Sequence, residues 1–318
     1  MDIDRRRFLQ RLGALAAMAG ATTAEARATA DSASRFPWDA TSIVAAGPRS
    51  AHNSSPLLPS LNFETFVPGK GNEIALGAAM QVAKRSGSHK PLHICAGTGL
   101  GKTHLCHAIG NHILCNEPTA RVRFIYAEAF VADLIRAYRD RSVERFRSGY
   151  RSLDVLLIDD ISFLLEKPKM QNEFFRLSNA LLGLGKQIVI AGDALPAPHW
   201  ESGEGVPCPF GDGINVTLGR PDFDLRVGVL LATARVIGIT LHDDVTRYIA
   251  TRIRSDVREL QAAFRRVLAY ASVHGRQVSI PVAQDALRGL PAEQPVPQAD
   301  SDPRSLHGHE RRSETCRP

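Results

Sequence analysis

The sequence predicts an α/β fold, in which a parallel sheet carries helices on both faces and a small all-helical domain follows it. Three observations predict this fold. Short apolar runs alternate with helical patterns through the middle of the chain, and a glycine-rich turn follows the first of these runs. The third run ends in two adjacent carboxylates. After Pro221 the strand patterns stop and only helical patterns continue.

The elements are expected in the following order. An amphipathic helix is expected on the face formed by Ile74, Ala75, Ala78, Ala79 and Val82. Strands are expected at Leu92–Cys95, Val122–Tyr126, Val155–Ile158, Ile188–Ile190 and Ile214–Leu218. The later helices are expected at about Asp222–Gly238, Asp243–Ser255, Asp256–His274 and Pro281–Leu290. The expected domains are an α/β nucleotide-binding domain over 61–220 and a helical domain over 221–290, with a linker over 29–60 and a disordered tail over 291–318.

The composition excludes several classes of protein. Apolar residues make up 44% of the chain, which excludes a wholly disordered or collagen-like protein. Aromatic residues make up 6%, which argues against a protein that stacks bases along a single strand. The net charge of +6 comes mainly from arginine and fits either codon bias or a nucleic-acid surface. Five cysteines without metal-ligand spacing fit a reducing compartment.

A phosphate-binding loop is predicted where the first strand passes into the next helix. The Walker A pattern is matched by Ala96, Gly97, Thr98, Gly99, Leu100, Gly101, Lys102 and Thr103, with Ala96 at the usual first glycine. Glycines let backbone N–H groups point at phosphate oxygens, and the positive end of the helix adds to the attraction. Lys102 would reach the β and γ phosphates and Thr103 would hold Mg²⁺, with His104 as the last expected nucleotide contact. The alternative is a glycine-rich turn without a ligand.

A Walker B pattern is predicted at the end of the third strand, where Asp159 and Asp160 follow Val155–Ile158. Parallel strands present ligands at their carboxyl ends, where the phosphate loop also lies. Asp159 would support Mg²⁺, often through water. Asp160 is expected to act catalytically by polarising the attacking water. The alternative is an acidic turn after a buried strand.

Beyond these two motifs, the chain resembles the family of bacterial replication initiators, DnaA. The segments that carry the resemblance in the α/β part are Gly99–Leu105, His107–Asn111, Tyr150–Ile161 and Glu173–Phe175. The segment Phe63–Asn72 is similar to the family's stretch around the adenine. In the helical part, Arg254–Leu260 is similar to the family's sensor 2 helix. The resemblance covers residues 61–290. The resemblance implies an AAA+ ATPase, with a five-stranded α/β module and a helical lid, which binds ATP or ADP with Mg²⁺ and self-assembles.

The resemblance also implies two further catalytic residues. Arg258 would touch the γ-phosphate from the lid, so that the bound nucleotide sets the angle of the lid. Asp193 follows the fourth strand and falls at the family's sensor 1 position.

The chain departs from the family pattern in several places. Initiators carry an arginine before the fifth strand that completes the ATP site of the neighbouring subunit, and here Pro209 falls at that position. Ala194 likewise stands where the family usually has arginine. Such an arginine raises hydrolysis by orders of magnitude, so weak or no assembly-stimulated hydrolysis is expected. Neither the family's C-terminal helix-turn-helix domain, which binds origin DNA, nor its N-terminal loading domain is expected in this chain.

Arginines gather between residues 127 and 154. They are Arg136, Arg139, Arg141, Arg145, Arg147 and Arg151. In the family this region grips single-stranded DNA, and Val131 and Lys169 lie near the family's contacts. Such a surface would bind phosphates regardless of sequence and with strong salt dependence. The alternative is a solvated amphipathic helix that is rich in arginine for codon reasons.

The first 28 residues point to a different compartment. Arg5-Arg6-Arg7-Phe8-Leu9, the apolar run 12–21 and Ala26-Arg27-Ala28 resemble a twin-arginine export signal, and the run is too short to span a membrane. A compartment without ATP would leave an ATPase without substrate. A cytoplasmic protein is therefore expected, and export stays open.

The expected function is that of an ATP-binding, DnaA-like AAA+ protein that acts in or regulates chromosomal replication initiation. Its expected partners are DnaA or other replication initiation proteins. Two alternatives stay open: a stand-alone P-loop ATPase that acts on another substrate, and a degenerate nucleotide-binding paralogue without turnover.

Overall fold

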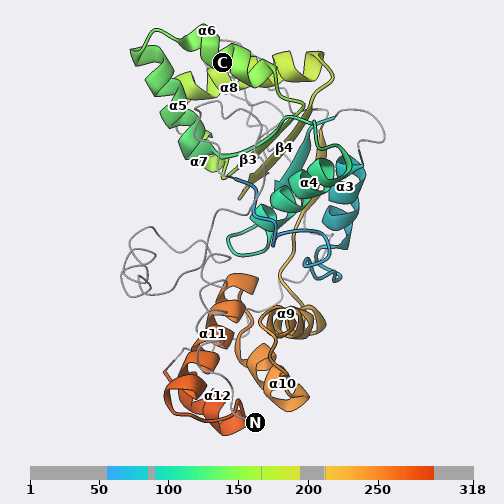
Figure 1. Cartoon of the computed structure of the whole chain (residues 1–318), viewed down its shortest axis with the longest axis vertical. Helices are drawn as coiled ribbons and strands as arrows, with labels where there is room; N and C mark the ends of the chain where they lie inside the picture. Colours follow the sequence, from blue (N-terminus) through green and yellow to red (C-terminus); the bar gives the residue numbers. More distant parts are fainter. Residues whose placement is uncertain (1–55, 85–89, 166, 194–210, 212, 290–318) are drawn as a thin grey trace, which may run out of the picture.

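The computed structural model describes residues 56–84, 90–165, 167–193, 211 and 213–289. Several expectations fall outside these residues, namely the export-signal-like segment, most of the linker, Ala194, Pro209 and the C-terminal tail. The described chain forms an α/β domain joined to a helical domain (Figure 1). Within the described ranges, no helix is long and apolar enough to cross a membrane.

Five parallel strands form one sheet in the order β2-β3-β4-β1-β5. Their bounds are β1 Leu92–Cys95, β2 Val122–Tyr126, β3 Val155–Asp159, β4 Gln187–Gly192 and β5 Ile214–Thr217. Each strand coincides with an apolar run of the sequence, and β4 extends beyond its run at both ends. The predicted fold class is confirmed.

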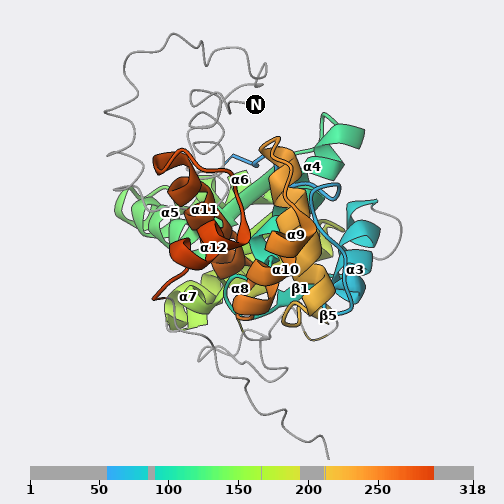
Figure 2. The ribbon, with the colours of Figure 1, turned by 90° about the horizontal axis from the view of Figure 1, so that it is seen from below.

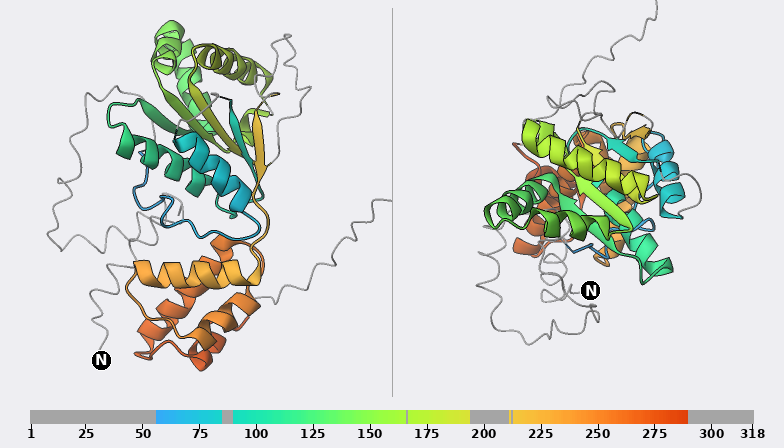
Figure 3. Two further views of the ribbon diagram at one scale, coloured as in Figure 1. Left: turned by 90° about the vertical axis from the view of Figure 1, so that its right-hand side faces the viewer. Right: turned by 90° about the horizontal axis from the view of Figure 1, so that it is seen from above.

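Helices cover both faces of the sheet (Figure 3). Two of them, α3 (Glu73–Ala83) and α4 (Lys102–Asn116), pack on the face that receives Val155 and Leu157 of β3. The other face receives Leu156 and Ile158 and is covered by α5 Ala127–Arg139, α6 Val143–Arg151, α7 Ser162–Leu165 and α8 Pro168–Gly183. Successive residues of β3 therefore enter opposite cores, which explains why the whole run is apolar.

Helix α3 buries a narrower face than its sequence pattern predicts. Ala75, Ala79 and Val82 are buried against the sheet, whereas Ile74 is 76% exposed. The expectation that Ile74 belongs to the apolar face is therefore wrong. Successive residues of a helix lie about 100° apart, so the helix that turns Ala75 and Ala79 inward turns Ile74 toward solvent.

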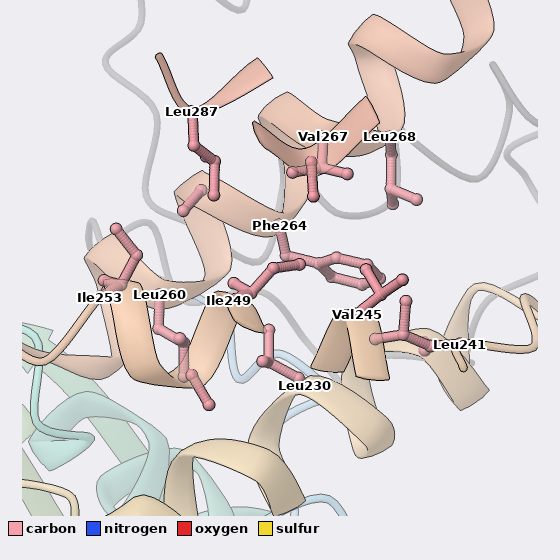
Figure 4. Packing of buried hydrophobic residues seen from close by; sticks show 14 of the residues in the cluster. Leu230, Leu241, Val245, Ile249, Ile253, Leu260, Phe264, Val267, Leu268 and Leu287 are labelled. Atoms are coloured by element: carbon pink, nitrogen blue, oxygen red, sulfur yellow. The ribbon is translucent and has the colours of Figure 1, made fainter. Parts of the chain in front are cut away.

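The helical domain follows β5 and has its own core. It consists of α9 Phe223–Val236, α10 Asp243–Arg252, α11 Val257–Val273 and α12 Ile280–Ala286, which lie together in the view from below (Figure 2). Phe264 of α11 is fully buried at the centre of this core, beside Ile249 and Val245 of α10 (Figure 4). The side chains of Asp222 and Asp256 cap α9 and α11, because they accept hydrogen bonds from Leu225 N–H and Glu259 N–H.

Residues 57–72, the leading segment, connect the two cores. Phe66 is buried in the core of the α/β domain, and its neighbour Val67 packs against the core of the helical domain. A Cβ on Gly228 of α9 would lie 2.9 Å from Val67 Cγ1, so this close approach requires glycine. The segment contacts α4 already at Leu58, whose N–H donates to His107 Nδ1 over 3.2 Å.

Candidate nucleotide-binding site

The candidate site lies at the carboxyl ends of β1, β3 and β4. Residues 96–101 connect β1 to α4, and Asp159 and Gly192 end β3 and β4 beside them. This edge of the sheet faces the helical domain, because Asp256 at the start of α11 contacts Gly99 of the loop. In open parallel sheets, ligands bind outside the carboxyl ends of the strands, so the site has the position that the fold favours.

Two glycines give the loop its shape. Gly99 has a φ of +75° and Gly101 has a φ of +103°, and side chains disfavour both conformations. Gly101 is the N-cap of α4, so the helix begins at Lys102. The first backbone N–H groups of a helix lack intrahelical acceptors and attract anions. The loop therefore presents N–H donors toward the edge of the sheet, as the Walker A pattern predicts.

The ammonium group of Lys102 lies inside the loop. Its Nζ donates to Ala96 O over 2.7 Å, to Gly97 O over 3.0 Å and to Asp193 Oδ1 over 2.7 Å. The Lys102 side chain is only 11% exposed, whereas the Asp193 side chain is 50% exposed. Asp193, predicted at the sensor 1 position, thus lies against the lysine that is predicted to bind phosphate.

Thr103 and the two Walker B carboxylates lie beside this lysine. Thr103 Oγ1 donates to Asp159 Oδ2 over 2.5 Å, and Asp160 N–H donates to Asp159 Oδ1 over 2.8 Å. Burial raises the pKa of Asp159, and these two hydrogen bonds together with the charge of Lys102 oppose the shift. Asp160 is exposed and has a φ of +57°, a left-handed conformation that aspartate adopts more readily than most residues.

This set of groups fits a nucleotide polyphosphate with Mg²⁺. Lys102 and the start of α4 supply positive charge, which suits phosphates. Thr103 and Asp159 supply a hydroxyl and a carboxylate oxygen, which are the kind of ligands that Mg²⁺ prefers.

The helical domain brings Arg258 to the same region. Arg258 is exposed on the first turn of α11 and forms no ion pair with any residue that the structure describes. Its charge acts on Tyr126 at the end of β2. Burial and the nearby Asp159 raise the pKa of Tyr126, and the guanidinium of Arg258 opposes that shift. Tyr126 pairs with Asp159 in the sheet register. The sequence alone does not predict that Tyr126 lies beside the site, because its only sequence feature is its position at the end of an expected strand.

The His104 side chain is turned away from the loop. Its Nε2 lies 3.0 Å from Asn62 O and 3.2 Å from Thr65 Oγ1, both in the leading segment. Its ring packs edge-on against Phe66, at 5.2 Å between ring centroids. Burial lowers the pKa of His104, which favours the neutral ring. His104 therefore stays near the phosphate loop only through its backbone, which lies in the first turn of α4 after Lys102 and Thr103.

Comparison with known proteins places this arrangement in a family. The sequence profile of the bacterial DnaA ATPase domain matches residues 57–216, half of the chain and the whole of the predicted phosphate site. The chain belongs to the bacterial DnaA family. It is 41% identical over 242 residues to the chromosomal replication initiator protein DnaA of Paraburkholderia phymatum, which covers 76% of this chain and 47% of that protein. The chain thus spans about half the length of the curated DnaA proteins that it matches.

Solved DnaA structures have the same fold. Domain III of the replication initiation protein DnaA from Thermotoga maritima superposes with a TM-score of 0.69 at 36% identity, over 73% of this chain and 98% of that one. A replication initiator DnaA bound to AMPPCP and single-stranded DNA superposes with a TM-score of 0.58 at 25% identity, over 72% of this chain and 80% of that one. This chain therefore carries a DnaA-like AAA+ domain, as the resemblance implied.

The arginine-rich insert of this DnaA relative consists of α5 and α6. Arg139, Arg141, Arg145 and Arg151 are exposed, whereas Arg147 donates from its Nη2 to both carboxylate oxygens of Glu173 over 2.8 and 2.9 Å. Val131 is only 4% exposed and packs in the core of the α/β domain. The side chain of Val131 is thus turned toward the sheet, and the prediction that Val131 lies near a bound DNA strand stays a prediction. Lys169 is exposed on the first turn of α8.

Proposed function

We propose that this chain binds ATP or ADP together with Mg²⁺ at the loop formed by residues 96–103. The observation that carries the proposal is the 2.5 Å contact between Thr103 Oγ1 and Asp159 Oδ2 at the start of α4. It brings the two predicted Mg²⁺ ligands, which are 56 positions apart in the sequence, to one point beside Lys102. The DnaA structure with AMPPCP, an ATP analogue, supports the same assignment by similarity.

Each site residue then has a defined role. Mg²⁺, held by Thr103 and Asp159, would neutralise phosphate charge and orient the phosphates. Lys102 would bind the β and γ phosphates. Asp160 would orient the attacking water and accept its proton. Asp193, which pairs with Lys102, would act at the sensor 1 position. Arg258 would reach the γ-phosphate from the helical domain, which acts as the lid.

We further propose that the protein acts in or regulates chromosomal replication initiation in the cytoplasm, together with DnaA or other replication initiation proteins. The similarity to chromosomal replication initiators supports this role. A cytoplasmic location supplies the ATP that the proposed site requires.

Hydrolysis is proposed to be slow and insensitive to self-assembly. The support comes from the sequence, in which Pro209 stands where initiators carry the arginine that enters the neighbouring site. Arginine in that position supplies charge to the transition state, and proline supplies none. The same observation favours the second candidate function, a nucleotide-binding paralogue without turnover.

Single-stranded DNA is the proposed partner of α5 and α6. The side chain of Arg139 is 75% exposed, and Arg145 is exposed on the neighbouring helix. Replacing both with alanine should weaken binding to labelled single-stranded DNA and reduce its salt dependence, because each arginine displaces counterions from phosphate. Arg247→Ala, an exposed arginine of α10, is the control. Equal binding by the double variant and the control would contradict the proposed surface.

Equilibrium binding of ATP with and without Mg²⁺ tests the proposed site. Removing Mg²⁺ should weaken binding to the wild type by at least about tenfold, and Thr103→Ala should lose most of this dependence. Thr119→Ala, the same change in an exposed turn, is the control. If Thr103→Ala keeps the full Mg²⁺ dependence, Thr103 is not a ligand.

A further inference from the structure

An acidic side chain of the helical domain lies directly on the phosphate loop. If Gly99 carried a Cβ, it would lie 2.5 Å from Asp256 Cγ, 2.5 Å from Asp256 Oδ1 and 2.8 Å from Asp256 Oδ2. The carboxylate therefore fills the space that a side chain at position 99 would occupy. Gly99 is required for this close approach as well as for its φ of +75°.

The carboxylate of Asp256 is held in this position. Asp256 is the N-cap of α11, and its Oδ1 accepts a hydrogen bond from Glu259 N–H over 2.8 Å. Its backbone oxygen also accepts from Leu260 N–H over 3.1 Å. Rotating the side chain away from the loop would break the cap, so this hydrogen bond holds the carboxylate against the loop.

Among the described residues, Asp256 has no basic partner. It forms no ion pair with a residue in the part of the chain that the structure describes, and Lys102 in the same loop is paired with Asp193. The start of α11 thus brings two opposite charges near the loop, the carboxylate of Asp256 and the guanidinium of Arg258 two residues later. The other acidic residue of this turn, Glu259, accepts a hydrogen bond from Ser255 Oγ. A polyphosphate bound to the loop would be attracted by Arg258 and repelled by Asp256.

We propose that Asp256 determines nucleotide specificity by charge, lowering affinity more for each additional phosphate. The inference rests on the proposed nucleotide site and goes beyond it, because it gives the helical domain a repulsive contact. Coulomb repulsion near a protein surface grows with the charge of the ligand and is weakened by salt. ATP would therefore displace Asp256 from Gly99 more strongly than ADP, and an uncharged nucleoside would leave it in place.

Asp256→Asn tests the proposal, because asparagine keeps an N-cap and removes the charge. The variant should bind Mg·ATP about tenfold more tightly than the wild type, Mg·ADP about threefold more tightly and adenosine equally well. These gains should shrink as the salt concentration rises. Asp222→Asn is the matched control, since Asp222 caps α9 in the same way, with its side chain accepting from Leu225 N–H over 2.8 Å. The control should leave all three affinities unchanged.

Hydrogen exchange of the Glu259 amide provides a second measurement. Saturating ATP should speed exchange at this amide in the wild type, because displacement of the Asp256 carboxylate breaks its hydrogen bond to Glu259 N–H. The effect should be smaller in Asp256→Asn.

An equal gain for ATP, ADP and adenosine would overturn the proposal. So would a loss of ATP affinity in Asp256→Asn, or the same response in Asp222→Asn. If the wild type binds ATP and Lys102→Ala weakens that binding, but Asp256→Asn changes nothing, this inference fails while the proposed site stands. If the wild type binds no nucleotide, both fail.

Discussion

Lys102 and Asp193 form an ion pair at the centre of the site, with 2.7 Å between Nζ and Oδ1. Lys102 ends the phosphate loop and Asp193 follows β4, so the pair connects two strand ends that are adjacent in the sheet. Because Lys102 also donates to two loop carbonyls, a phosphate oxygen must compete with Asp193 for the ammonium group. We therefore propose that Asp193 competes with phosphate for Lys102 during binding and makes a polar contact during hydrolysis.

Asp193→Asn separates these effects. Removing the competing charge should leave Mg·ATP affinity equal or raise it by up to about fivefold, since ion pairs with an exposed partner contribute little. Turnover should fall, because the side chain at the predicted sensor 1 position loses its charge. Calorimetric titration and single-turnover hydrolysis measure the two quantities. A tenfold loss of affinity would show that Asp193 helps to bind the nucleotide.

The rate of ATP hydrolysis per subunit should stay constant as the protein concentration rises. The reason is Pro209, which offers no charge to a neighbouring subunit. Steady-state phosphate release over a hundredfold range of concentration measures this, with Pro209→Arg as the gain-of-charge variant. A wild-type rate that climbs steeply with concentration would mean that another arginine reaches the neighbouring site.

Stability should fall as the pH drops from about 6.5 toward 4, partly because of His107. Its Nδ1 accepts from Leu58 N–H, its ring lies 4.1 Å from that of Phe124 between centroids, and burial lowers its pKa to about 4. A lowered pKa means that the unfolded chain binds the proton more tightly. The stabilisation is therefore complete above the unfolded pKa and is lost as the pH falls through the folded pKa.

His107→Gln isolates this contribution, because glutamine retains an acceptor and does not titrate. The variant should be less stable than the wild type at pH 7, and its stability should change less between pH 6.5 and 4. Chemical denaturation at each pH provides the measurement. His93 and His104 also have lowered pKa values, so both proteins should keep part of the slope. If stability changes equally with pH in both proteins, His107 does not contribute to this pH dependence.

Asp133→Asn should destabilise the α/β domain by about 3 kcal/mol, because it leaves the charge of Arg123 buried without its partner. Arg123 Nη2 lies 3.0 Å from Asp133 Oδ2, and both side chains are almost fully buried. The control is Asp140→Asn, which removes an exposed ion pair with Arg139 and should cost less than about 1 kcal/mol. Urea unfolding of both variants compares them. Equal losses would show that burial adds nothing to the Arg123–Asp133 pair.

The strands and the phosphate site can be predicted from local sequence, because each is specified by a short run of neighbouring residues. An apolar run such as Val155–Ile158 is buried on both faces, and the glycines of the loop are needed where φ is positive. Spacing along the chain therefore predicts Lys102, Thr103 and Asp159 at one edge of the sheet. The resemblance to DnaA extends this prediction to Arg258.

Other features depend on packing between distant segments. Nothing in the local pattern around His104 shows that its side chain turns toward Asn62 and the leading segment. Val131 and Ile74 are both apolar, yet one is buried and the other exposed, because the rotation of each helix is set by the neighbours it packs against. The contact between Asp256 and Gly99 joins residues of two domains, and only the folded chain brings them together.

The most direct test of the central claim is calorimetric titration of Mg·ATP into the wild type and into Lys102→Ala. Lys102 is the cation inside the loop, with its Nζ 2.7 Å from Ala96 O and 3.0 Å from Gly97 O. Lys84→Ala, an exposed lysine at the end of α3, is the control. The wild type and the control should bind equally, and Lys102→Ala should bind at least about tenfold more weakly, a loss of about 1.4 kcal/mol. Equal affinities in all three proteins would contradict the assignment of residues 96–103 as the nucleotide site.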